Sequence, residues 1–119
     1  MKVVDVFEEL AKHPEGSFVD LLKFNHAHFS VCDITGESPV WEMHPDTDEF
    51  FYILDGQFKI TLLDADTPTI HLVDTGSVFV VPTGIWHKPA APNGCKFMYF
   101  TPGESLHSKA PDPRVENIK

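Results

Sequence analysis

Residues 36–56 of this 119-residue chain read GESPVWEMHPDTDEFFYILDG. The polar cluster in the middle, residues 42–49, lies between two apolar runs and contains several side chains that bind metals. Side chains alternate between the two faces of a strand, so Glu42 and His44 project from the same face. A tight connection would fold Glu49, which begins the next apolar run, back beside His44. The stretch therefore predicts a hairpin that presents two or three ligands on one face.

The rest of the chain is a series of short apolar runs separated by turn residues. A helical spacing of apolar residues covers Val3–Lys12, and His13-Pro14-Glu15-Gly16 ends it. The runs that follow have the length and composition of strands. They are Ser17–Phe24, Ala27–Ile34, Pro39–His44, Phe50–Leu54, Phe58–Leu63, Thr69–Val73, Val78–Val81 and Lys96–Thr101. This pattern predicts an all-β fold, a jelly-roll barrel with a short N-terminal helix.

Composition limits the classes of protein to which the chain can belong. With 119 residues, 42% of them hydrophobic, we expect one domain over 1–119, with a helix and turn in 1–16 and a tail or lid in 102–119. The net charge of −9 disfavours nucleic acid and anionic membrane surfaces as partners. The acidic N-terminus and the lack of a long apolar run predict a soluble cytoplasmic protein. The two cysteines, Cys32 and Cys95, form no redox motif.

A second stretch supplies another metal-binding side chain. Residues 76–91 read GSVFVVPTGIWHKPAA, in which Pro82-Thr83-Gly84 ends an apolar strand and His87 follows. The turn returns the chain across the mouth of the predicted barrel, so His87 can join the ligands of the first stretch.

Together the two stretches resemble the motifs of the cupin superfamily. The first motif is Gly, five residues, His-x-His, three or four residues, Glu, six residues and Gly, and it reads here as Gly36, Glu42-Met43-His44, Glu49 and Gly56 with the same spacing. The second is Gly, five residues, Pro-x-Gly, two residues, His, three residues and Asn. It reads here as Gly76, Pro82-Thr83-Gly84, His87 and Ala91.

The resemblance implies a double-stranded β-helix barrel with a divalent metal inside, held by His44, Glu49 and His87. The superfamily includes dioxygenases, isomerases, epimerases, lyases, decarboxylases and non-enzymatic binding proteins, so the fold alone does not select a function. Glu42 stands where the family usually has its first histidine, and Ala91 replaces the closing asparagine. The second change affects only turn chemistry, whereas the first changes the metal site.

Glu42 leaves three arrangements open. As a fourth ligand it would give a site with no net charge around a divalent ion, and the ion would be a weaker Lewis acid than one held by three histidines and one glutamate. Its oxygen would favour iron or manganese, although zinc or nickel also fit. Off the metal, it would be free to act as a catalytic general base beside His44, Glu49 and His87. In a degenerate site it would only form hydrogen bonds to His44 or His87, with no metal bound.

Other side chains are candidates for the pocket wall. Phe51 shares the strand face of Glu49, and Phe97 and Tyr99 lie on a strand that should line or back the barrel. His26 and His28 lie two apart on a strand, where either a ligand role for His28 or a polar strand face fits. His71 and His107 are expected on the surface or in the tail.

These observations lead to two functional hypotheses. The first is a metal-dependent enzyme of dioxygenase, isomerase or lyase type that acts on a small organic molecule. The second is a non-catalytic binding or sensor module for a small molecule. Because small jelly rolls expose edge strands, we also expect a homodimer.

Overall fold

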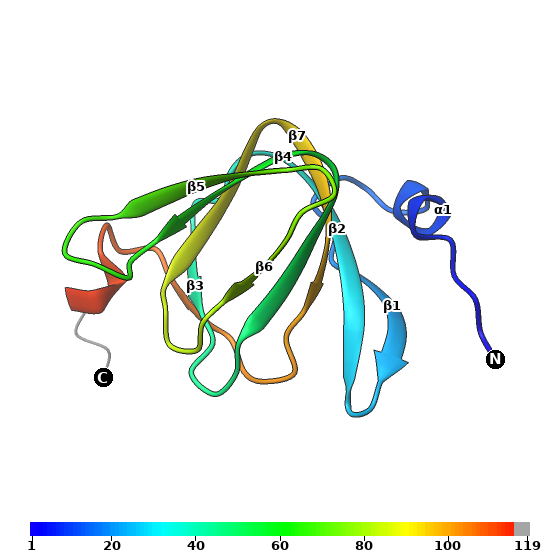
Figure 1. Ribbon diagram of the computed structural model, residues 1–119, viewed down its shortest axis with the longest axis horizontal. Coiled ribbons are helices and arrows are strands. Elements are labelled where there is room, and N and C mark those ends of the chain that lie inside the picture. Colours follow the sequence, from blue (N-terminus) through cyan, green and yellow to red (C-terminus); the bar gives the residue numbers. More distant parts are fainter. Residues whose placement is uncertain (116–119) are drawn as a thin grey trace.

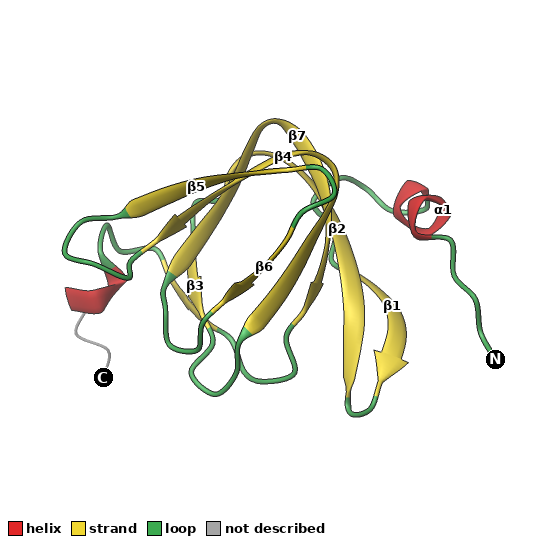
Figure 2. Cartoon of the chain, viewed as in Figure 1, coloured by secondary structure: helices red, strands yellow, loops and turns green. Residues whose placement is uncertain are grey.

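The structure is a computed structural model and describes residues 1–115. Within these residues, eight strands form one antiparallel sheet that curls into a barrel (Figure 1). The strands are β1 (Val19–Phe24), β2 (Ala27–Glu37), β3 (Trp41–Met43), β4 (Glu49–Leu62), β5 (Thr69–Asp74), β6 (Val78–Val81), β7 (His87–Phe100) and β8 (Leu106–Ser108). The helices are α1 (Val6–Ala11) and the 3₁₀ turn η1 (Pro113–Val115), one at each side of the molecule (Figure 2). The predicted all-β jelly-roll class with a short N-terminal helix is confirmed.

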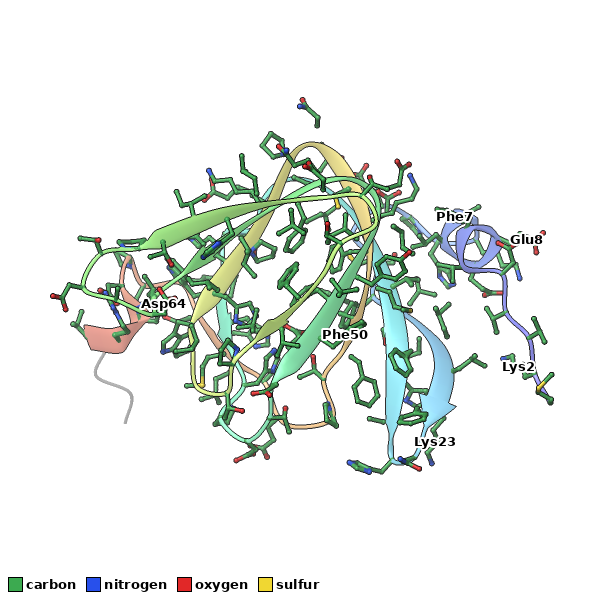
Figure 3. All side chains as sticks on the ribbon, viewed as in Figure 1. Lys2, Phe7, Glu8, Lys23, Phe50 and Asp64 are labelled. Carbon is green, nitrogen blue, oxygen red and sulfur yellow. The ribbon has the colours of Figure 1, made fainter. Side chains whose placement is uncertain are left out.

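Strand β7 organises the sheet because it pairs with three other strands. It pairs with β2 along one edge, with β4 along the other, and with β3 at its first residue, where Glu42 lies opposite His87. Strand β4 pairs in turn with β5 and β6. Side chains from the opposing walls fill the interior (Figure 3).

Strands β4 and β7 differ most from the runs predicted from the sequence, because each is 14 residues long. Phe50–Leu54 and all but the last residue of Phe58–Leu63 are parts of the single strand β4. Lys96–Thr101 overlaps the end of β7, which begins at His87. The residues Asp55-Gly56 and Pro92-Asn93-Gly94 have the composition of turns and are expected to separate strands, but they form bends within β4 and β7. Gly56 and Gly94 adopt positive φ angles of 96° and 87°, so each strand bends without losing its partner.

The bend in β4 also changes which side chains point inward. Glu49, Phe51 and Ile53 are buried before it, and Phe58 and Ile60 are buried after it, so the inward parity shifts by one residue. The four apolar residues belong to the main core, in which the rings of Phe51 and Phe79 stack at 4.7 Å between centroids. Burying several phenylalanines contributes roughly 1.5–3 kcal/mol each to stability.

Helix α1 is short and packs on the outside of the barrel. The Asp5 side chain accepts a hydrogen bond from the Glu8 amide and caps its first turn. Leu10 packs against Val19 and Val31, while Phe7 stays half exposed at the periphery (Figure 3). No helix among residues 1–115 is long and apolar enough to cross a membrane.

The segment predicted as a tail or lid contains regular structure. Strand β8 pairs with β3, placing His107 opposite Glu42, and η1 follows it. Residues 116–119 of the predicted tail lie outside the described residues.

Replacing Gly56 by alanine tests the bend of β4. An added Cβ would overlap the carbonyl oxygen of Gly94 on β7 and lie 3.1 Å from the Cα of Cys95. We expect Gly56→Ala to lower the free energy of unfolding by about 3 kcal/mol or more, measured by chemical denaturation.

Gly76→Ala is the matched control for this substitution. Gly76 has a φ of 88°, but nothing lies within 4 Å of an added Cβ. The control should lose only about 1 kcal/mol, the cost of the backbone conformation alone. Equal losses in the two variants would contradict the close approach of β4 and β7.

Candidate metal centre

Three strands bring four metal-binding side chains to one end of the barrel. Glu42 lies on β3 and His44 directly follows it, while Glu49 and His87 are the first residues of β4 and β7. The turn before β7 is tied to the same end, because the Gly84 amide donates to the His44 carbonyl. His44, Glu49 and His87 are buried, and the Glu42 side chain is 29% exposed.

The ligand atoms of these four residues face one another. The Oε1 atom of Glu42 lies 3.0 Å from Nε2 of His44 and 3.5 Å from Nε2 of His87. The Oε1 atom of Glu49 lies 3.2 Å and 3.0 Å from the same two nitrogens. All four ligand atoms lie within 4.8 Å of one another, a grouping that fits a divalent metal ion.

Backbone carbonyls decide the tautomer of both histidines. Nδ1 of His44 lies 3.1 Å from the Glu104 carbonyl oxygen, and Nδ1 of His87 lies 3.0 Å from that of Ile85. A carbonyl oxygen only accepts hydrogen bonds, so each Nδ1 carries a proton and donates it. Each neutral imidazole therefore presents an unprotonated Nε2 to the centre, as a metal ligand must.

In the metal-free chain, protons on the His44 and His87 imidazoles supply the positive charge that balances the carboxylates of Glu42 and Glu49. Burial lowers the pKa of His44, but hydrogen bonds to Glu42 and Glu49 outweigh it and raise that pKa to about 10. Burial also lowers the pKa of His87, and hydrogen bonds to the same two carboxylates outweigh it and raise that pKa to about 9. Burial raises the pKa of Glu42 and Glu49, but hydrogen bonds to the two histidines leave both below their ordinary values.

Residues after β7 form further contacts that sequence reasoning missed. The Thr101 hydroxyl donates a short hydrogen bond to Oε2 of Glu49, and Nε2 of His107 lies 3.0 Å from Oε2 of Glu42. The Ser105 hydroxyl lies 3.0 Å from Nδ1 of His44. His107 is exposed and lies in the predicted tail, as expected from the sequence, but its contact with Glu42 was not predicted. Among these residues, only Thr101 could have been predicted from the sequence to face the site, because it lies two positions after Tyr99 on the same face of the predicted strand.

A cavity of about 940 Å³ opens beside the four residues. Phe51, Phe97, Tyr99 and His28 all line it, as does His26. Neither His26 nor His28 belongs to the group of four possible metal ligands within the described part of the chain. His71, expected on the surface, is exposed on β5 and does not line the cavity. The walls combine aromatic rings with several polar side chains, among them Asp20, Ser30 and Ser38. Sites for small organic molecules commonly join aromatic walls to convergent polar groups.

Comparisons with known proteins agree with this architecture. The cupin domain family matches residues 30–101. An uncharacterized Bacillus subtilis protein, YdbB, is 31% identical over 77 residues, which cover 56% of this chain and 65% of that protein. A 3-hydroxyanthranilate 3,4-dioxygenase from Brucella anthropi is 32% identical over 94 residues, 76% of this chain and 50% of the enzyme. The chain thus spans less than two thirds of either relative.

Solved structures show the same fold. A cupin-2 domain containing protein from Shewanella frigidimarina superposes with a TM-score of 0.75 at 29% identity, over 84% of this chain and 94% of that one. Hydroquinone 1,2-dioxygenase from Sphingomonas superposes with a TM-score of 0.67 at 17% identity, over 83% and 78%, which shows likeness of fold alone. With its curled sheet, both motifs and a family match over most of the barrel, the chain belongs to the cupin family.

Proposed function

We propose that this cupin is a metal-dependent enzyme that acts on a small organic molecule bound in the cavity. The observation that carries the proposal is the convergence of two Nε2 atoms and two carboxylate oxygens, with both Nδ1 protons committed to backbone carbonyls. The set offers two neutral and two anionic donors, which favours iron or manganese over softer ions. A bound ion would supply Lewis-acid or redox chemistry beside the cavity.

Oxidation of a small aromatic compound by dioxygen is the reaction type we favour. The 3-hydroxyanthranilate 3,4-dioxygenase relative supports it, since its similarity extends over 76% of this chain. The aromatic walls of the cavity, including Phe51, Phe97 and Tyr99, suit a flat ligand that lies beside the metal. The homodimer and the cytoplasmic location expected from the sequence stay predictions.

Within this proposal Glu42 is the fourth metal ligand and not a free base. Its Oε1 atom faces both imidazole nitrogens, and its Oε2 atom is engaged by His107. The low pKa of Glu42, which results from hydrogen bonds to His44 and His87, keeps it ionised at neutral pH and makes it a weak proton acceptor.

Removal of His87 should abolish stable metal binding. His87→Ala deletes a buried ligand, so we expect metal affinity to fall by at least about 100-fold and the purified chain to carry far less than one ion. Elemental analysis and competition with a chelating dye measure this. His71→Ala, on exposed β5, is the control and should keep wild-type occupancy. Full occupancy in His87→Ala would contradict the centre.

Substitutions of Glu42 separate a ligand from a base. As a ligand, Glu42→His should retain one ion per chain with affinity within about tenfold of wild type, whereas Glu42→Ala should lose about 10–100-fold. A catalytic base would instead leave metal affinity unchanged in Glu42→Ala and remove only turnover. Tight binding of metal and ligands by the wild-type chain, without turnover under aerobic screening, would favour the non-catalytic binding module.

Metal binding should release protons, because the ion replaces the positive charge on two histidines. The raised pKa values of His44 and His87 keep both protonated at pH 7 in the metal-free chain. We expect about two protons per ion at pH 7, measured by calorimetry in buffers of different ionisation enthalpy. The number should fall as pH rises through 9 to 10, where the metal-free histidines lose their protons. Release of no protons at pH 7 would contradict this arrangement.

A further inference from the structure

One short segment contacts three of the four residues of the centre. We call residues 101–108 the C-terminal clasp. Its Thr101 hydroxyl donates to Oε2 of Glu49, and its His107 Nε2 lies 3.0 Å from Oε2 of Glu42. The Glu104 carbonyl and Ser105 hydroxyl meet Nδ1 of His44 at 3.1 Å and 3.0 Å.

The clasp is anchored on both sides of the centre. Strand β8 pairs with β3 in a register that sets His107 opposite Glu42. Gly103 lies so close to Thr47, in the loop between His44 and Glu49, that an added Cβ would come within 2.9 Å of the Thr47 methyl carbon. The segment is thus packed against strand β3, which carries Glu42, and against the loop that joins His44 to Glu49.

Both carboxylates are restrained in the same manner. In Glu42 and in Glu49, the clasp engages Oε2 from outside, and Oε1 faces the two imidazoles. Each carboxylate oxygen has two lone pairs, so the hydrogen bond does not block Oε2, but it fixes the orientation of the carboxylate. In that orientation Oε1 faces the centre, which favours one metal bond through Oε1 over chelation by both oxygens.

We propose that the C-terminal clasp is the positioning element of the metal centre, and that Thr101 and His107 hold Glu49 and Glu42 to one metal bond each. Two consequences follow if the proposed metal function is correct. The clasp sets the metal affinity, because it orients three ligands before the ion arrives. It also limits the coordination number, which leaves room on the ion for a small molecule from the cavity that the clasp helps to line.

Paired substitutions of the clasp test this inference in the full chain. Thr101→Val keeps the shape of the side chain but removes the donor, whereas Thr101→Ser keeps the donor. His107→Ala removes the contact to Glu42, and His107→Gln restores an N–H group. We expect Thr101→Val and His107→Ala each to weaken Co²⁺ affinity by about 10–100-fold, and the conservative variants to stay within about threefold of wild type.

The visible spectrum of bound Co²⁺ reports coordination directly. In Thr101→Val and His107→Ala, the released carboxylates are free to chelate the ion, so the d–d absorption should weaken as the coordination number rises. Thr101→Ser and His107→Gln should keep the wild-type spectrum. Leu106→Ala is the control, since this exposed apolar side chain lies in the same segment and can form no hydrogen bond to the four residues, and it should change neither readout.

The outcomes distinguish this inference from the proposed function. Wild-type affinity and spectrum in both donor-removing variants would overturn the inference and leave the metal function intact. A wild-type chain that takes up no Co²⁺, Fe²⁺, Mn²⁺ or Zn²⁺ would refute the proposed function and the inference with it. Thermal unfolding of the metal-free variants checks that they fold. If Thr101→Val fails to fold, the comparison of His107→Ala with His107→Gln tests the inference, because His107 is exposed and its replacement disturbs the core less.

Discussion

Four hydrogen-bond acceptors that face one another in a desolvated space require positive charge between them. Here the acceptors are Nε2 of His44 and His87 and Oε1 of Glu42 and Glu49, and the carbonyls of Glu104 and Ile85 fix the tautomers. Two imidazolium protons neutralise the two carboxylates, and so does one divalent ion with neutral imidazoles. The centre has zero net charge in either form, so an ion can replace two protons without leaving a buried charge uncompensated.

This charge balance also bears on the chemistry. Three histidines and one glutamate around a divalent ion leave a net charge of +1, whereas the present set leaves none. A neutral centre is a poorer generator of hydroxide and stabilises a higher oxidation state of the metal better than a positive one does. Together with the aromatic cavity walls, this supports the proposed oxidation of an organic molecule over metal-assisted hydrolysis.

The barrel supplies the rigidity that the centre needs. Glu49 and His87 are the first residues of two 14-residue strands whose middle parts form the main core. The bends at Gly56 and Gly94 let β4 and β7 stay paired while they pass from one wall of the barrel to the other. Displacement of either ligand would therefore disturb a packed aromatic interior, which holds the ligands near one geometry.

The fold class and the candidate ligands could be predicted from the amino-acid sequence, because strand alternation and motif spacing are local properties. The sequence placed Glu42 and His44 on one strand face and brought Glu49 and His87 to the same end of the barrel. It did not predict the continuous β4 and β7, since the glycines that mark turns also permit bends within paired strands. The histidine tautomers and the contacts of Thr101, Ser105 and His107 depend on the tertiary structure and could not be predicted in this way. Those contacts join residues as many as 65 positions apart, and their register depends on the pairing of β3 with β8, which no local pattern encodes.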